Sequence, residues 1–341
     1  MLDLARLERV RLHRRPWAHV LVGDWFLRPS YRFPRRTEIV IEGIERLPKD
    51  RSVFLAMNHT DRYNYWPLQY ALHRRREYRY IATWVKGKYY EHPGVAWFMD
   101  MTNNIPLPSR GYVLTTEFRR TVGRVPSEDE YRQLRDLADG NLSVQQSAFA
   151  EASADLRRFL TAQGADPDRK PAQEGVRETA FLPRFEELFD RMIEAVVRLN
   201  QAALGTYQCN VLVFPQGTRS KRLSRGHTGL AQMSQRLGAA IIPIGCNGSD
   251  KAYPGSSPWA SGGRIVYRVG PVLEPDGPEL GSHRVHEEFT PFSREAVGRF
   301  GDRFGAITDV VMSRINALLD PEYQAGEGAE SDGVRGMKRF V

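Results

Sequence analysis

Short runs of apolar residues alternate with longer amphipathic stretches along most of this chain. Runs of about four to eight apolar residues between turn residues are typical of strands, whereas apolar residues three or four positions apart are typical of helices. The pattern predicts strands over residues 38–43, 52–57, 80–85, 104–107, 211–214, 240–244 and 264–269. It predicts helices over residues 65–76, 95–101, 229–237 and 294–319.

Most of the predicted strands are apolar throughout instead of alternating between apolar and polar residues. Strands of this kind are buried on both faces, as in parallel sheets covered by helices on both sides. The predicted fold class is therefore α/β, with a mostly parallel central sheet flanked by helices. Functional residues of such folds lie at the carboxyl ends of the strands. Thr60 or Asp61, just past the second strand, is expected to cap the helix that follows.

Residues 115–205 interrupt the strand and helix alternation. They are charged and largely helical, with stop signals at Gly140 and Asn141 and through residues 164–171. Apolar residues at positions 185, 188, 189, 192, 193, 196 and 199 form a helical stripe that must be buried somewhere, in a lid or in a dimer contact. The predicted organisation is an arm over residues 1–36, an α/β domain over 37–320 with a mainly helical insert at about 115–205, and a loose tail over 321–341.

The N-terminal arm carries most of the formal net charge of +8. Residues 1–36 hold nine arginines and three acidic residues, interleaved with Trp17, Trp25, Phe26, Tyr31 and Phe33. Arginine together with interfacial aromatics is typical of proteins that lie on anionic lipid, where each cation contributes about 1 kcal/mol. We expect the arm to contact an anionic membrane surface; packing onto the core is the alternative. Nucleic acid is not an expected partner, because no recognition module follows the arm.

Other features of the sequence bear on where the protein is expected in the cell and on whether it binds a metal. The longest apolar stretch, residues 17–27, contains His19 and Asp24 and is shorter than the roughly 20 residues that a membrane span needs. Cys209 and Cys246 provide neither a disulfide framework nor a zinc spacing, and no secretory signal is visible. We expect a cytoplasmic protein attached peripherally to the inner face of a membrane. No metal is expected, since His283-x-x-His286 lacks a third ligand.

Two short motifs follow predicted strands and carry the candidate chemistry. Asn58-His59-Thr60-Asp61-Arg62-Tyr63-Asn64 comes after the strand at 52–57, and Phe214-Pro215-Gln216-Gly217-Thr218-Arg219-Ser220 comes at the end of the strand at 211–214. Gly217 allows the backbone to approach an anion closely. Backbone N–H groups of this turn, with Arg219 and Lys221, can bind a phosphate. The motifs therefore indicate a histidine base facing an anion site across two strand ends.

The motifs resemble those of the phospholipid/glycerol acyltransferases, the lysophosphatidic acid acyltransferase-like group. That family shows Asn-His-x-x-x-x-Asp, then a motif ending in Arg, then Phe-Pro-Glu-Gly-Thr-Arg-Ser, then an apolar strand that contains Pro. This chain offers His59, Arg110 after Ile105-Pro106-Leu107-Pro108-Ser109, the turn at 217–220, and Ile241-Ile242-Pro243-Ile244. The resemblance covers roughly residues 37–320 apart from the insert.

The resemblance implies transfer of a fatty acyl group from a thioester donor to the hydroxyl of a lysophospholipid-type acceptor. The donor, acyl-CoA or acyl-carrier protein, is a co-substrate, and no bound cofactor is implied. His59 would be the general base and Asn64 the residue that orients it, with Asp61 as the alternative. The implied substrate-binding residues are those of the third motif with the preceding arginine: Arg110, Gln216, Gly217, Thr218, Arg219, Ser220 and Lys221.

Two positions depart from the family pattern in the same way. Asn64 stands where the family has Asp, and Gln216 stands where it has Glu. An amide can still orient a histidine, but it stabilises imidazolium far less than a carboxylate does, and the corresponding change in a serine protease costs around 10⁴ in rate. Three alternatives stay open: Asn64 orients His59, Asp61 has taken over, or the protein binds lipid without turnover. We expect an active enzyme; the more cationic pocket also allows a non-glycerol acceptor.

Overall fold

The computed structural model describes residues 1–139, 152–164 and 181–326. The stop signal predicted at Gly140 and Asn141, and most of the predicted loose tail, lie outside these residues. Seven strands of the described chain form one sheet in the order β1-β7-β6-β2-β5-β3-β4. The strands are β1 (Thr37–Glu42), β2 (Phe54–Met57), β3 (Ile81–Lys86), β4 (Asn104–Leu107), β5 (Asn210–Val213), β6 (Ile241–Asn247) and β7 (Gly263–Val269).

Every neighbouring pair in the sheet is parallel except β6 and β7, which are antiparallel. The prediction of an α/β fold with a mostly parallel sheet is therefore confirmed. Adjacent residues of β2 show why its sequence is apolar throughout: Phe54 and Ala56 belong to one hydrophobic core, and Leu55 and Met57 to a second. Successive side chains of a strand point to opposite faces, so both faces of this sheet are covered.

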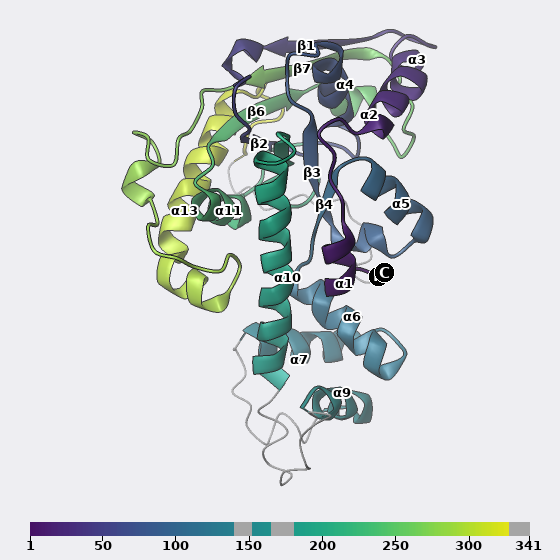
Figure 1. The fold of residues 1–341 in the computed structure, drawn as a ribbon. Helices are drawn as coiled ribbons and strands as arrows, with labels where there is room; N and C mark the ends of the chain where they lie inside the picture. The colour runs from purple at the N-terminus through teal and green to yellow at the C-terminus, as the bar shows by residue number, and fades with distance from the viewer. Residues whose placement is uncertain (140–151, 165–180, 327–341) are drawn as a thin grey trace.

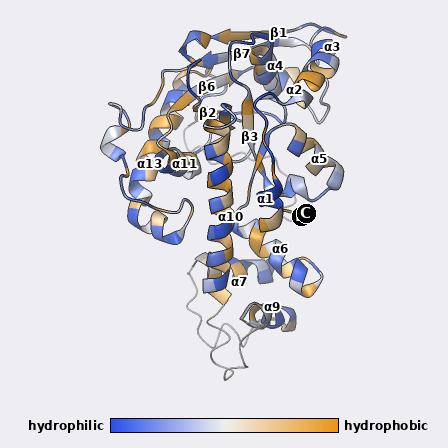
Figure 2. Ribbon diagram, in the orientation of Figure 1, coloured by the Kyte–Doolittle hydropathy of each residue, from blue (hydrophilic) through white to orange (hydrophobic). Residues whose placement is uncertain are grey.

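Helices cover both faces (Figures 1 and 2). One core includes residues of α1 (Leu4–Arg9), α6 (Arg110–Val122), α7 (Glu128–Asp139), α9 (Ala154–Gly164), α10 (Phe181–Leu204), α11 (Gly229–Leu237) and α13 (Arg294–Ala317). The other includes residues of η1 (Val22–Leu27), α4 (Trp66–Arg74) and α12 (Ser249–Ala252). The remaining helical segments are α2 (Trp17–Leu21), α3 (Arg28–Ser30), η2 (Ile44–Arg46), η3 (Gly87–Tyr90), α5 (Pro93–Met101) and η6 (Gly281–His283).

The start of α4 corrects one prediction. Neither Thr60 nor Asp61 caps this helix; its N-cap is Tyr65, which makes no side-chain capping hydrogen bond. Asp61 Oδ1 instead accepts from the Tyr63 backbone N–H at 2.8 Å. The chain bends between residues 61 and 64, so the carboxylate reaches the amide two residues ahead, as in an Asx-turn, and not the first turn of the helix.

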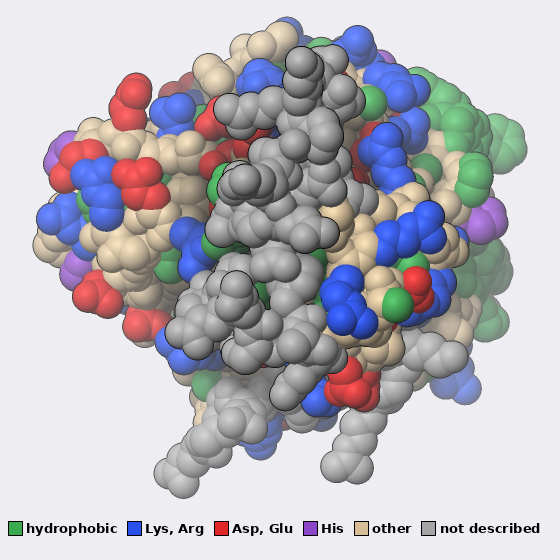
Figure 3. All heavy atoms as spheres, turned by 90° about the horizontal axis from the view of Figure 1, so that it is seen from below, with side chains coloured by type: hydrophobic (Ala, Val, Ile, Leu, Met, Phe, Trp, Pro, Cys, Tyr) green, Lys and Arg blue, Asp and Glu red, His purple; other side chains and the backbone are tan. Residues whose placement is uncertain are grey.

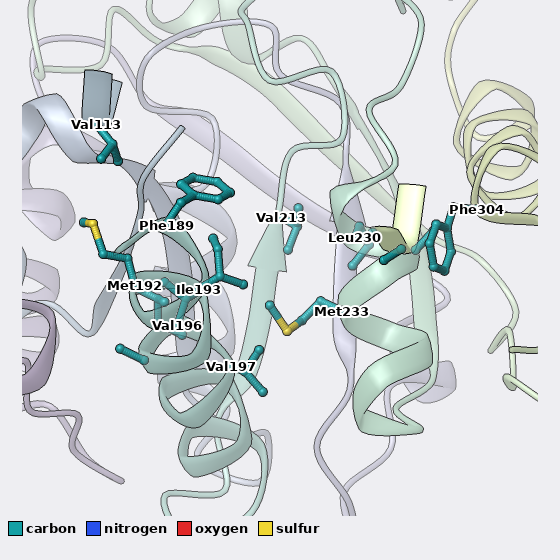
Figure 4. Close-up of a cluster of buried hydrophobic side chains, with 14 of the residues drawn as sticks. Val113, Phe189, Met192, Ile193, Val196, Val197, Val213, Leu230, Met233 and Phe304 are labelled. Atoms are coloured by element: carbon teal, nitrogen blue, oxygen red, sulfur yellow. The ribbon is translucent and has the colours of Figure 1, made fainter. Parts of the chain in front are cut away.

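The long helix α10 buries the apolar stripe that the sequence left without a partner. Five residues of the stripe are buried in the first of the two cores, which includes α1, α6 and α13 and is called the main core from here on: Phe185, Phe189, Met192, Ile193 and Val196. Figure 4 shows Phe189, Ile193 and Val196 in a buried cluster with Val213 of β5 and Met233 of α11, and Leu230 and Phe304 farther from α10. The stripe thus packs against the sheet of its own chain. Neither the lid nor the dimer interpretation anticipated this. Helix α10 belongs to the helices that cover one face of the sheet.

The N-terminal arm is folded onto this body. Leu2, Leu7 and Val10 are buried in the main core, and α1 lies beside α10 (Figure 1). Farther along, η1 packs against α4 and α2 packs against α5, while Trp17 and Trp25 stay exposed. Within the described residues, no helix combines the length and apolarity required to cross a bilayer.

Candidate functional site

The two sequence motifs meet at the carboxyl ends of β2 and β5, which are parallel neighbours in the sheet. The backbone N–H of His59 donates to Gln216 Oε1 at 2.8 Å, and the Ser220 N–H donates to the His59 carbonyl at 2.9 Å. Two hydrogen bonds therefore tie the histidine residue to the turn that follows β5. The structure brings His59, Gln216 and Ser220 together, although 157 residues separate His59 from Gln216.

Asn58 fixes the backbone just before the histidine. Its side-chain Nδ2 donates to the Cys246 carbonyl at 2.9 Å, and its Oδ1 accepts from the Cys246 N–H at 2.7 Å. Both partners belong to the end of β6, on the other side of β2. The buried amide thus continues the ladder between these strands by one step and leaves the Asn58 carbonyl available to another group.

The His59 ring is held on two sides. It stacks on Phe214, with ring centroids 4.0 Å apart and an interplanar angle of 18°. Its Nδ1 lies 3.2 Å from Asn64 Oδ1, and Asn64 Nδ2 donates to the Asn58 carbonyl at 2.8 Å. The backbone carbonyl of Asn64 accepts a hydrogen bond from the Tyr267 hydroxyl at 2.6 Å. Within the described part of the chain, Nε2 makes no hydrogen bond, so the ring is hydrogen-bonded at Nδ1 alone.

The pKa of His59 is lowered to about 3: burial is the main cause, the bond to Asn64 raises the pKa, and Arg219 and Lys86 lower it. The imidazole is therefore neutral at pH 7, the form in which it can accept a proton. A neutral histidine beside cations is one arrangement by which proteins set the pKa of a base, although burial alone also shifts pKa values.

Lys86 is a site residue that the sequence analysis did not select. It ends β3, the strand next to β5, and so lies at the same edge as the two motifs. Burial, Lys88 and Arg219 all lower the pKa of Lys86, although part of its side chain stays exposed. The signal in the sequence was its position directly after the apolar run at 80–85, since the candidate residues of the other two strands also follow apolar runs.

The residues of the turn at 216–221 differ in exposure and in their partners. Gly217 has φ of +67°, and a Cβ there would lie 2.9 Å from His227 Cδ2, so glycine is needed for both conformation and space. Thr218 and Arg219 are partly exposed, next to buried Ser220. Lys221 instead forms an ion pair with Glu322 at 3.0 Å. Of the residues predicted for an anion site, Gly217, Thr218 and Arg219 are partly exposed in the turn, whereas Lys221 pairs with Glu322.

Asp61 is buried next to the site, and burial raises the pKa of its carboxyl group. One oxygen accepts from the Tyr63 N–H and the other from the Thr60 hydroxyl, at 2.8 and 2.9 Å. These bonds support the bend that places Asn64 against the ring. It is Asn64, and not Asp61, that contacts His59 Nδ1.

Arg110 lies at the start of α6, after β4. Its guanidinium forms an ion pair with Glu186, donates to the Ala138 carbonyl and lies over the rings of Phe185 and Phe189. Strands β3 and β5 separate β4 from β2, which corresponds to roughly 14 Å across the sheet at about 4.8 Å per strand. In the described chain, the contacts of Arg110 are with Glu186, Ala138, Phe185 and Phe189, and none of them is with His59.

Other parts of the described chain show less. Two hollows of about 730 and 460 Å³ lie along α10, both bordered by Glu186 and Asp190, and neither is lined by a residue of the two motifs. No three His, Cys, Asp or Glu side chains in the described ranges gather in a way that could hold a metal ion. Cys209 and Cys246 are buried free thiols.

Comparisons with known proteins give a similarity to a solved structure. No protein-family model matches the chain, and no curated protein matches it. Among solved structures, the chain is similar to the crystal structure of the 1-acyl-sn-glycerophosphate (LPA) acyltransferase PlsC from Thermotoga maritima. The sequence identity is 13% and the TM-score 0.39, over 91% of this chain and 80% of that chain. No conclusion about substrate or residues rests on this similarity.

Proposed function

We propose that the protein is an acyltransferase that moves a fatty acyl group from a thioester donor to the hydroxyl of a lysophospholipid or related phosphorylated glycerolipid. The observation that supports this most is the state of His59: a neutral ring, hydrogen-bonded at Nδ1 and not at Nε2 within the described chain, with Arg219 and Lys86 close enough to affect its pKa. A base next to a cationic region suits an acceptor that carries both a hydroxyl and a phosphate.

In the proposed reaction, the acceptor hydroxyl donates a hydrogen bond to Nε2 of His59. The ring takes the proton as the hydroxyl oxygen attacks the thioester carbonyl. The new carbon–oxygen bond completes the ester, the carbon–sulfur bond breaks, and the imidazolium returns the proton to the departing thiolate. A positioned base of this kind contributes about 10²–10⁴-fold to the rate.

The cations have two roles in this proposal. Arg219 and Lys86 would hold the acceptor phosphate by charge-assisted hydrogen bonds. In the free protein these cations lower the pKa of His59. A bound phosphate would offset their charge, and the pKa of the base would rise when the acceptor is in place. The phosphate thereby supplies part of the negative charge that Asn64 and Gln216 lack.

A membrane-facing surface is the second part of the proposal. Large exposed hydrophobic side chains gather on α2, η1 and α5, with Trp17 57%, Trp25 80% and Trp97 61% exposed. Figure 3 shows hydrophobic side chains at the margin where α2 and α5 lie in Figure 1, next to Lys and Arg side chains. Tryptophans beside arginines fit an anionic membrane, where the acceptor lipid would be found. Attachment to the inner face of a membrane would place the site beside its substrate.

The acyl-transfer proposal is tested with purified protein, labelled acyl-CoA or acyl-carrier protein, and lysophosphatidate. The wild type is expected to form diacylated product, and His59→Ala is expected to lose it. His286→Ala provides a matched control, because His286 is exposed and far along the sequence from either motif. Product formed equally well by His59→Ala, or no product from the wild type with either donor, would refute the proposal.

Lipid binding without turnover is the alternative that the two amides favour. It predicts that the protein binds lysophosphatidate, with lower affinity in Arg219→Gln, but forms no ester with any donor. A non-glycerol acceptor, such as an amino-acid lipid, is the other alternative. Offering a panel of acceptors to the same preparation distinguishes it, since the product would then appear only with the non-glycerol lipid.

A further inference from the structure

Asn64 and Gln216 both form hydrogen bonds with His59, one with its ring and one with its backbone. We propose that these two amides are positioning residues: Asn64 holds the His59 ring as the Nδ1–H tautomer and Gln216 holds its backbone, while each amide also donates to a backbone carbonyl, as a carboxylate in its place could not. The use of that tautomer as a base depends on the proposed acyl transfer, whereas the tautomer itself does not.

The orientation of the Asn64 amide follows from its partner. The Asn58 carbonyl can only accept a hydrogen bond, so the atom 2.8 Å from it must be the Asn64 NH₂ group. The side-chain oxygen of Asn64, Oδ1, must then face His59 Nδ1, at 3.2 Å. Because this oxygen can only accept, Nδ1 must carry the proton. The neutral ring is left with its lone pair on Nε2, where a base needs it.

This arrangement reverses the usual effect of an amide beside a histidine. In a serine protease, Asn in place of the triad Asp favours the wrong tautomer. Here a flipped Asn64 amide would put its oxygen against the Asn58 carbonyl and leave two buried acceptors facing each other. Asn58 and Asn64 are 2% and 0% exposed, so water cannot easily take the place of the missing donor. The backbone of Asn58 thus selects the useful tautomer.

Gln216 is oriented by the same kind of reasoning. The His59 backbone N–H can only donate, so the atom 2.8 Å from it is Gln216 Oε1. The NH₂ group then faces Ser224 Oγ at 3.2 Å and the Arg222 carbonyl at 3.4 Å. Glutamate would keep the bond to His59 but set an oxygen against the Arg222 carbonyl. Since the Ser224 hydroxyl can turn and donate, glutamate should be tolerated better at 216 than aspartate at 64.

The charges around the ring give the proposal a second consequence. Arg219 from the turn after β5 and Lys86 from β3 are the charged groups that act on His59, and the nearby carboxylate of Asp61 is bonded to Thr60 and Tyr63. The amide of Asn64 adds no negative charge to the surroundings of the His59 ring. The acidic limb of the kcat/KM profile, which reports the free protein, should therefore lie well below pH 6.5. A carboxylate at position 64 should move it to higher pH.

The tautomer can be measured directly by ¹⁵N-histidine labelling and multiple-bond ¹H–¹⁵N correlation spectra of the full chain at pH 7. We expect the His59 signal, assigned by its loss in His59→Gln, to show a protonated Nδ1 and an unprotonated Nε2. A protonated Nε2, either as the other neutral tautomer or as imidazolium, would overturn the proposal. This measurement needs no activity, so inactivity with the Nδ1–H tautomer would refute the proposed function and leave the tautomer proposal standing.

Two variants extend the test. Asn64→Asp should raise the pH at which His59 protonates, and the acidic limb of kcat/KM, by at least about one unit, since an adjacent carboxylate favours the charged ring. Gln216→Glu should leave the tautomer unchanged and move the limb less. An Asn64→Asp protein that is folded and keeps the wild-type pH profile would show that residue 64 does not position the ring. Should Asn64→Asp fail to fold, the wild-type spectrum still decides.

Discussion

His59 and His19 are both buried, neutral imidazoles, but they lie in different regions and use their nitrogens differently. On α2 of the N-terminal arm, His19 Nε2 donates to the Thr102 carbonyl at the end of α5, 2.9 Å away. Burial lowers the pKa of His19 to about 4, the bond to Thr102 raises it, and His73 lowers it. His59 at the carboxyl edge has a similarly lowered pKa of about 3, yet its bonded nitrogen is Nδ1 and its neighbours are cations.

The comparison shows that burial and a lowered pKa do not by themselves indicate a catalytic histidine. The Nε2 of His19 is occupied by a backbone carbonyl, which pins the arm to the body of the protein. The Nε2 of His59 makes no hydrogen bond within the described residues, and Arg219 and Lys86 act on the ring. The hydrogen-bonding partner of each nitrogen, and the charges around the ring, separate a structural histidine from a candidate base.

The largest difference between the two regions should appear in activity. His59→Gln is expected to lower the rate of acyl transfer by about 10²–10⁴, because it removes the proton acceptor. His19→Gln should keep most of the activity, since a glutamine amide can still donate to the Thr102 carbonyl. Initial rates of ester formation measure both. A larger loss in His19→Gln would reverse the assignment of the two histidines.

The next largest effect concerns the cations near His59. Arg219→Gln and Lys86→Gln should each raise KM for lysophosphatidate by roughly 10- to 100-fold, the range expected for one hydrogen bond to a charged group. The effect should shrink with an acceptor that lacks phosphate. Arg110→Gln should leave KM near the wild-type value and lower Tm instead, because it leaves Glu186 without its partner. A KM increase in Arg110→Gln would return Arg110 to the site.

Membrane binding should distinguish the arm from the carboxyl edge. Trp25→Ser combined with Trp97→Ser is expected to weaken binding to anionic vesicles by about tenfold, as two interfacial aromatics are lost. Catalysis with a detergent-dispersed acceptor should change little. Vesicle co-sedimentation and the detergent assay measure the two effects. Equal binding by the double variant and the wild type would exclude this surface as the membrane contact.

The last comparison concerns the pH dependence of stability. The native pKa of His19 is about 4, below its usual 6.5, so between these values the unfolded state binds the proton more readily. The free energy of unfolding should therefore fall as pH drops from 6.5 towards 4, by up to about 1.4 kcal/mol per unit for each such ring. Urea unfolding at pH 7, 5.5 and 4.5 should show a shallower slope for His19→Gln. An unchanged slope would mean that His19 does not remain neutral.

The sequence by itself determined where the strands lie and where along the chain the candidate site residues follow them. A continuous apolar run is a local property, and β4 and α11 occupy the residues predicted for them. The same holds for the positions of His59 and Gly217, since each directly follows such a run. The parallel arrangement of the sheet then required these strand ends to share one edge. None of this depended on which helix covers which face.

Tertiary structure decided the partners. Arg110 pairs with Glu186, Lys86 joins the site because β3 adjoins β5, and α10 buries its stripe in the main core. These contacts join residues far apart in the chain, and periodicity carries no information about such pairings. The orientation of the Asn64 amide is the clearest case. Its side chain has the same composition either way round, and only the Asn58 carbonyl, fixed by β6, decides which end faces the histidine.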